Sequence, residues 1–323
     1  MISGIECVTL GVSDLDTALT LFRDVCGLRV ESDTRASVSL LSLWGLAPYE
    51  DVRLVELSCD GEAFGRIRLA RYPDPQLRVT RRDHGPAAID AATDVGPKAL
   101  DLYVAPPLKN AIAVLTAAGC ELRAGPTRFL VRGSDTEEAL LTGPAHTPLL
   151  LMVGHRHPKR AQRAVPRPGR TSEVATVSVI VADRDATRRF YVDGLGLRAD
   201  DIDDELEGDS RVRVCRLFGA PEDSRVSLML FRDPAQPSGK VQAVHFHERT
   251  THELAAPMRP GNIGISLFST RCAQLETLRE RLQDAGLAAG HLPIVHVALG
   301  DGMPARVMLT RGPNGELFEF IEL

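Results

Sequence analysis

The chain has 323 residues, of which 44% are hydrophobic and 25% are charged. This length favours two domains, and the composition is typical of a globular protein rather than a disordered, collagen-like or membrane-spanning chain. The 38 Lys and Arg residues are outnumbered by 43 Asp and Glu residues, which gives a formal net charge of -5. Because no overall positive field would attract nucleic acid or an anionic membrane, we expect a small-molecule partner and neither of those two.

Hydrophobic spacing in the first half predicts the order strand, helix and three strands, twice over. An apolar strand covers residues 6–12, and a helix begins at Asp14 and ends at Gly27. Further strands are predicted around residue 30 and at residues 37–43, 51–58 and 65–72. A strand at 99–104, a helix at 108–118 and a last strand at 149–153 complete this half.

The second half repeats this order. Its first strands are predicted at residues 175–181, 211–217, 225–231 and 240–247. A strand at 262–268, a helix at 272–285, a hairpin at 297–309 and a last strand at 317–323 follow. Residues 12–30 and 181–199 align without a gap at an offset of 169, with seven identities. The sequence therefore predicts a tandem duplication that contains four β-α-β-β-β units.

A basic segment separates the halves. Residues 154–170 contain six Lys or Arg residues, three prolines and no acid, which indicates an exposed linker. Binding of nucleic acid by this segment is disfavoured because no aromatic residues are interleaved with the charges. We therefore predict an N-terminal module at 1–153, a linker at 154–171 and a C-terminal module at 172–323.

Targeting features and cysteine motifs are not evident in the sequence. The first ten residues, MISGIECVTL, contain no basic region and no apolar run of signal-peptide length. The longest later apolar run, residues 149–153, is too short to span a bilayer. We therefore expect a cytoplasmic protein, and the six scattered cysteines predict neither a zinc knuckle nor a disulfide framework.

The VSDLD and GLRV motifs that open the first half, their counterparts in the second half, and the ending GPNGELFEFIEL resemble the vicinal oxygen chelate superfamily. That superfamily includes glyoxalase I, bleomycin-resistance proteins and extradiol dioxygenases. The resemblance implies an α+β fold in which four β-α-β-β-β units pair into two tandem cup-shaped modules. Because one fold supports many functions, the site has to be interpreted residue by residue.

The resemblance also implies positions for the ligands of a divalent metal, on the first and last strands of each unit. In the C-terminal module these positions hold Thr176, Gln242, Asn262 and Glu319. In the N-terminal module they hold Cys7, Arg68, Lys98 or Ala99, and Leu150. Iron, manganese and zinc sites need two or three imidazole, carboxylate or thiolate donors, and only Glu319 is such a donor in the C-terminal module. We expect no cofactor; if a metal is present, Glu319 is its expected ligand.

Glu319 is the principal candidate catalytic residue, because a buried carboxylate in an apolar strand suits a general acid or base. The alternative is a relic that is hydrogen-bonded to Asn262 and Thr176. His245 and His247 are further candidates for proton transfer, although strand alternation turns them away from Gln242, and a solvated strand end is the alternative. The candidate ligand-binding residues are Thr176, Gln242, Asn262, Ser266 and Phe246.

Three functions follow from these candidates. The first is an enzyme that acts on a cyclic or aromatic compound in the C-terminal cup by metal-independent acid–base chemistry, as an isomerase, lyase or cyclase. The second is a protein that binds and sequesters a hydrophobic small molecule or antibiotic without turnover. The third is an extradiol-type dioxygenase with an altered metal site of Glu319 and histidines from residues 245–252. A monomer or homodimer is expected.

The two modules differ at equivalent positions. Arg68 and Leu150 in the N-terminal module stand where the C-terminal module has Gln242 and Glu319. An arginine without a carboxylate partner cannot be buried without a large cost. We therefore predict that the N-terminal module is structural and that the open pocket lies within residues 172–323.

Overall fold

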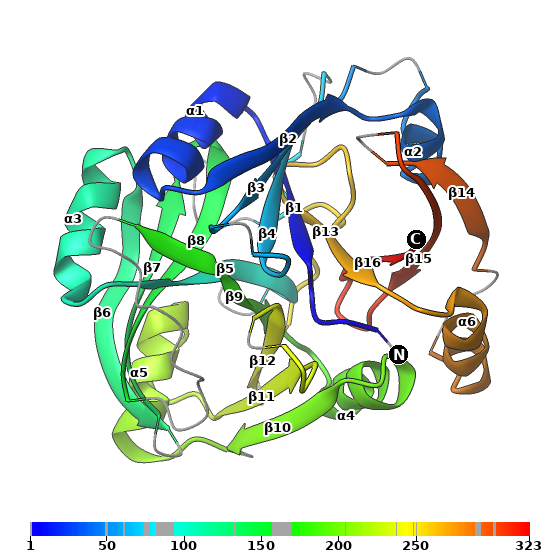
Figure 1. The fold of residues 1–323 in the computed structure, drawn as a ribbon. Coiled ribbons are helices and arrows are strands. Elements are labelled where there is room, and N and C mark those ends of the chain that lie inside the picture. The colour runs from blue at the N-terminus through cyan, green and yellow to red at the C-terminus, as the bar shows by residue number, and fades with distance from the viewer. Residues whose placement is uncertain are drawn as a thin grey trace.

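Two curled eight-stranded sheets form the frame of the protein in a computed structural model (Figure 1). The structure describes residues 2–48, 51–60, 62–73, 78–81, 94–131, 134–156, 170–203, 205–236, 238–247, 249, 251–287, 292–299 and 302–323. Most of the predicted linker and residues 300–301 of the predicted hairpin turn therefore lie outside the described residues. The α+β fold class is confirmed.

Sheet 1 combines strands from the first and last quarters of the chain. Its order is β14 (Ile294–Ala298), β15 (Pro304–Arg311), β16 (Leu317–Glu322), β13 (Gly264–Arg271), β1 (Cys7–Val12), β4 (Arg66–Arg71), β3 (Arg53–Ser58) and β2 (Arg29–Arg35). Sheet 2 combines the two middle quarters. Its order is β10 (Arg198–Asp203), β11 (Val226–Arg232), β12 (Lys240–Phe246), β9 (Thr171–Ile180), β5 (Gly96–Val104), β8 (Thr147–Arg156), β7 (Ser134–Gly143) and β6 (Glu121–Val131).

This pairing corrects the expected modules. Sheet 1 is joined where β1 runs antiparallel to β13, with Cys7 opposite Ser269. Sheet 2 is joined where β5 runs antiparallel to β9, with Leu100 opposite Val177. Each sheet therefore contains strands from both 1–153 and 172–323, and neither segment forms a cup by itself. Similar units present similar apolar faces, so strand alternation alone does not decide which units pair.

The first helix of each half is capped by an aspartate. Helix α1 (Leu15–Leu19) continues into the π-helical segment η1 (Thr20–Val25), and α4 (Arg184–Arg188) continues into η4 (Arg189–Gly194). Asp14 accepts a hydrogen bond from the Thr17 amide at 3.0 Å, and Asp183 accepts one from the Ala186 amide at 2.9 Å. These carboxylates satisfy amide groups that the first helical turn leaves unpaired. The predicted helices at 108–118 and 272–285 are α3 (Leu108–Ala117) and α6 (Leu275–Asp284).

Two predicted strands are helices. Residues 37–43 contain α2 (Val38–Leu43), and residues 211–217 lie in α5 (Gly208–Phe218). Ser37 caps α2 by accepting a hydrogen bond from the Leu40 amide at 3.2 Å. The alternating letters RVRV suggest a strand, but the buried side chains of α5 have helical spacing: Val214, Cys215, Leu217 and Phe218.

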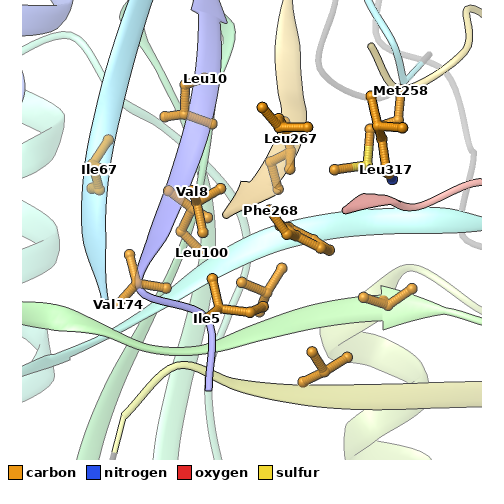
Figure 2. Close-up of a cluster of buried hydrophobic side chains, with 14 of the residues drawn as sticks. Ile5, Val8, Leu10, Ile67, Leu100, Val174, Met258, Leu267, Phe268 and Leu317 are labelled. Atoms are coloured by element: carbon orange, nitrogen blue, oxygen red, sulfur yellow. Dashed lines mark hydrogen bonds between the residues drawn. The ribbon is translucent and has the colours of Figure 1, made fainter. Parts of the chain in front are cut away.

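The largest apolar core lies where the two sheets meet (Figure 2). Val8 of β1 and Ile67 of β4 contribute to it from sheet 1, and Leu100 of β5 and Val174 of β9 contribute from sheet 2. All four side chains are fully buried. Because both sheets share this core, their opposite faces are left to form the two cups.

Among the helices that the structure describes, none has the length and the apolar composition of a membrane span.

Candidate functional site

A cavity of about 270 Å³ lies against sheet 1, on the side that we call cup 1. Its charged lining residues are Glu6, Glu31, Glu56, Arg66, Arg68, Arg271 and Glu319. Its apolar lining residues are Leu40, Leu54, Leu299, Met303, Ile321 and Leu323. The lining comes from both halves of the chain, so this cavity is not contained within residues 172–323.

Helix α2 closes one side of cup 1 by packing against the edge strand β14. Ser37 Oγ donates a hydrogen bond to the carbonyl oxygen of Ala298 at 2.6 Å, and the Ala298 amide donates to Ser39 Oγ at 3.1 Å. The helix ends at Trp44, the only tryptophan in the chain. This position brings the indole to Glu319, which lies 275 residues later.

Three donors hold the Glu319 carboxylate in β16. Trp44 Nε1 donates to Oε1 at 3.0 Å, and Ser269 Oγ donates to Oε2 at 2.8 Å. Arg68 Nη1 lies 3.5 Å from Oε2. The Glu319 side chain is only 1% exposed. The carboxylate is therefore buried as predicted, but its partners are not the expected Asn262 and Thr176.

Charges of alternating sign connect Glu319 to the rim of cup 1. Arg68 contacts Glu319 and also Glu56 Oε2, each at 3.5 Å. Arg66 pairs with Glu56 and lies 3.5 Å from Glu6, and Arg271 pairs with Glu6 at 3.0 Å. Three arginines and three carboxylates thus form one ion-pair chain from β13, through Glu6 just before β1, to β4, β3 and β16. Arg68 therefore has two carboxylate partners, which compensate the burial of its charge.

Cys7 lies within the electrostatic range of this chain. Burial raises the pKa of its thiol to about 12, and the neighbouring Glu56 carboxylate adds to the effect while Arg68 and Arg66 oppose it. Burial opposes the charge on Arg68, but nearby negative charge, including the Glu319 and Glu56 carboxylates, more than compensates and raises the pKa of this guanidinium. Cup 1 therefore contains a protonated thiol beside a permanently charged arginine.

The other predicted ligand-binding residues do not join Glu319. Thr176 and Gln242 lie on β9 and β12 of sheet 2. Asn262 precedes β13 and donates its side-chain amide to the Pro257 carbonyl at 2.8 Å. Ser266 is fully buried and donates to the Thr9 carbonyl at 3.1 Å. Asn262 and Ser266 thus support backbone groups, and the predicted cluster of Thr176, Gln242, Asn262 and Glu319 is not assembled.

His245, Phe246 and His247 also belong to the sheet 2 side of the molecule. His245 Nδ1 lies 3.0 Å from the Val181 carbonyl oxygen, and His247 Nε2 lies 2.7 Å from Ser227 Oγ. The two imidazole rings contact each other with centroids 4.6 Å apart. Phe246 points the other way, into the apolar cluster that contains Leu150. The histidines and Glu319 are therefore on different sheets.

Helix α5 fills the cup of sheet 2. Its side chains Val214, Leu217 and Phe218 pack in one buried cluster with Leu150 and Phe246. Two acids are buried in the same sheet: Ser178 Oγ donates to Asp101 Oδ2 at 2.9 Å, while Asp101 Oδ1 has no hydrogen-bond partner. Burial raises the pKa of Asp101 well above its usual range and that of Glu138 to about 7. The filled cup combines residues of both halves of the chain, such as Leu150 and Phe246.

The comparisons with known proteins agree with this architecture. Residues 173–320 match the Glyoxalase/Bleomycin resistance protein/Dioxygenase superfamily. Glyoxalase I from Zea mays superposes with a TM-score of 0.63 at 13% identity, over 99% of this chain and 92% of its own. A putative dioxygenase from Bacillus subtilis superposes with a TM-score of 0.59 at 14% identity, over 99% of this chain and 85% of its own. No curated protein sequence matches the chain significantly.

Together these findings define a protein with two curled sheets of the glyoxalase type. Residues 173–320 match the model of the glyoxalase, bleomycin-resistance and dioxygenase superfamily, and the chain as a whole has the two-module fold of the glyoxalase I structure. The resemblance that the sequence motifs indicated is confirmed.

Divalent metals are common in this superfamily, but the donors in cup 1 do not fit one. Both oxygens of Glu319 accept hydrogen bonds, and Glu56 is paired with two arginines. Burial raises the pKa of the Cys7 thiol, which disfavours the thiolate that a metal needs. Within the described part of the chain, no group of three His, Cys, Asp or Glu side chains is placed to hold a metal ion. The Arg68 guanidinium lies among the donors instead.

Three residues of cup 1 were not identified as site residues from the sequence. Trp44 follows a helix that was predicted as a strand, and Ser269 lies on β13, which pairs with β1 of the other half. Glu56 lies on β3, which pairs with β2 and β4 of its own half. One clue was available: Glu56 is a single acid between apolar neighbours in RLVELS. Its importance depends on the pairing of β1 with β13, which strand patterns do not specify.

Proposed function

We propose that the protein is an enzyme that binds a small cyclic or aromatic molecule in cup 1 and acts on it by metal-independent proton transfer. The observation that carries this proposal is the position of Arg68, held between Glu56 and Glu319 in a cavity of about 270 Å³. This volume suits a molecule of about one ring with small substituents.

Arg68 is the group that contacts an oxygen atom of the bound molecule. Its side chain lines the cavity and is 14% exposed. Its two contacts of 3.5 Å are longer than the roughly 2.7–2.9 Å of a charge-assisted hydrogen bond. A guanidinium has five N–H donors, so it can donate a hydrogen bond to a ligand oxygen without losing either carboxylate. Its fixed positive charge would stabilise negative charge that develops on that oxygen.

Glu56 is the acid or base in this proposal, and Glu319 is a positioning residue. A general acid or base must reach the proton that it transfers. The Glu56 side chain is 16% exposed and lines the cavity, whereas that of Glu319 is 1% exposed behind its three donors. Glu319 therefore holds Arg68 directly and holds α2 through its hydrogen bond with Trp44. The more accessible carboxylate, Glu56, is the one that transfers the proton.

The test starts from Trp44, whose fluorescence reports on cup 1 because it is the only tryptophan. A panel of small aromatic ketones and phenols is screened for quenching, and deuterium exchange into each bound ketone is followed by NMR. Binding is expected to weaken in Arg68→Gln, and exchange is expected to stop in Glu56→Gln with binding retained. Arg53→Gln is the matched control, because Arg53 is exposed and pairs with Asp33 outside the cavity. Equal binding by wild type and Arg68→Gln would contradict the proposal.

Binding without turnover is the second candidate. It is favoured by the pairing of Glu56 with both Arg66 and Arg68, because a paired carboxylate must release a partner to take a proton. Quenching of Trp44 by a compound that shows no exchange and is recovered unchanged supports this candidate. The dioxygenase alternative requires Glu319 and nearby histidines to bind one metal ion. Glu319 lies in sheet 1 and His245 lies in sheet 2, so this pair does not form such a site.

A further inference from the structure

A second and larger hollow lies outside both cups. It has a volume of about 670 Å³ and is bounded by η4, by Gly286, Leu287 and Leu292 after α6, and by the end of β15. We call it the arginine groove, and the lining residues used below are Arg189, Phe190, Leu287, Leu292, Leu309 and Arg311. None of its lining residues lines cup 1.

One wall of the arginine groove is apolar and closely supported. Phe190 is buried and packs against Phe318 and Tyr191, with ring centroids 5.7 and 5.4 Å apart. Leu287 lies over Gly194, where a Cβ atom would approach it to 2.9 Å. A wall that is fixed by such contacts offers a preformed surface for an apolar ligand.

The charges of the groove have one sign. Its lining includes Arg189 and Arg311 and no acidic residue. Arg311 donates to two backbone carbonyls, of Met258 at 3.1 Å and Gly315 at 3.4 Å, rather than to a carboxylate. Arg189 is exposed, and within the described residues neither arginine forms an ion pair. Burial and the nearby charge of Arg259 both lower the pKa of Arg311, so a further cation borders the groove.

We propose that the arginine groove binds an amphipathic carboxylate, the class of a medium-chain fatty acid. The hydrocarbon chain lies along Phe190, Leu287, Leu292 and Leu309, and the carboxylate binds Arg189 and Arg311. A guanidinium matches a carboxylate with two parallel hydrogen bonds, and an apolar chain in contact with the wall is removed from water. This site is separate from cup 1 and does not depend on the function proposed there.

Isothermal titration of the full-length protein with octanoate tests the proposal. We expect saturable binding that 1-octanol and inorganic phosphate do not reproduce, because the first lacks the charge and the second lacks the chain. Replacing both arginines, in Arg189→Gln with Arg311→Gln, should weaken octanoate binding about tenfold or more through loss of two charge-assisted contacts. Arg128→Gln is the control, because Arg128 is an exposed arginine that pairs with Asp135 far from the groove.

Several results would overturn the proposal. If octanol bound as tightly as octanoate, the carboxylate charge would not contribute to recognition. If phosphate competed fully with octanoate, the hydrocarbon chain would not contribute. Unchanged affinity in Arg189→Gln alone and in the double variant would place the ligand elsewhere. The single variant is not expected to affect folding, because the Arg189 side chain is exposed and has no partner among the described residues. A large change of Trp44 fluorescence on octanoate binding would assign the ligand to cup 1 instead.

Discussion

At the scale of single residues, the ending GPNGE forms a buried polar joint between two units. Glu316 is fully buried and accepts hydrogen bonds from Tyr191 Oη at 3.0 Å, the Asn314 amide at 2.8 Å and Asn314 Nδ2 at 3.1 Å. Asn314 also accepts from the Ala182 amide at 3.2 Å and donates to Thr187 at 3.1 Å. The motif thus connects the turn before β16 to the first helix of the third unit.

Removing one partner of this joint should leave a buried carboxylate with too few donors. Asn314→Ala is expected to lower the free energy of unfolding by about 1–3 kcal/mol, the usual effect of an unsatisfied buried polar group. Urea unfolding measures the change. Asn110→Ala, an exposed change on α3, serves as the control. Equal stability of the two variants would show that Glu316 finds other partners.

A second residue-scale prediction concerns Glu138 in sheet 2. Burial raises its pKa from 4.5 in the unfolded chain to about 7 in the folded protein. The folded state therefore binds the proton more tightly, and the contribution to stability is full below pH 4.5 and is lost as pH rises through 7. The total is up to about 3 kcal/mol.

Glu138→Gln should remove this loss of stability. The variant and the wild type are expected to unfold at similar urea concentrations near pH 4.5, and the variant is expected to be the more stable of the two near pH 8. Thr136, which hydrogen-bonds Glu138, opposes the shift and is unchanged in both proteins. A constant difference between the two proteins across this pH range would contradict the assignment.

At the scale of elements, the two inserted helices make the cups unequal. Helix α5 has eleven residues and fills the cup of sheet 2, whereas α2 has six and leaves a cavity in cup 1. Leu150→Ala in the filled cup should cost about 2–5 kcal/mol of stability, as buried leucine truncations do. Trp44 fluorescence of the folded variant should be unchanged. Leu122→Ala, at an exposed position of β6, is the control, and a shift of the Trp44 emission would show that the cups are coupled.

The sequence predicts most elements, and its errors at this scale have a physical cause. Helix caps at Asp14 and Asp183 and the repeated strand–helix order are local features, so local patterns find them. Residues 211–217 alternate arginine and apolar side chains as a strand would, yet they form a helix because its buried face fills a cup. A short segment takes the conformation that its tertiary surroundings bury best, and that information is not local.

At the scale of the whole molecule, units 1 and 4 pair, as do units 2 and 3. Local patterns predict each unit but not its partner, because each unit offers the same kind of edge strand. The candidate site shows the consequence: Glu319 was identified from its own strand, whereas Trp44, Glu56 and Arg68 reach it only through the pairing of β1 with β13.

This pairing predicts that the two halves cannot fold independently as monomers. Residues 1–156 and 170–323 each supply half of both sheets, so each half alone leaves two central strands, such as β1 and β5, without their partners. Separately purified halves are expected to lack a cooperative unfolding transition, and mixing them is expected to restore one. A monomeric half with its own sharp thermal transition would contradict the sheet order.

The central claim is that a guanidinium, rather than a metal ion, supplies the positive charge in cup 1. Cobalt(II) titration of protein stripped of metals tests it directly, with visible absorption and Trp44 fluorescence as the two readouts. The account predicts no saturable cobalt site whose signals depend on Glu319. A one-to-one cobalt complex that quenches Trp44 in the wild type and is lost in Glu319→Gln would contradict it.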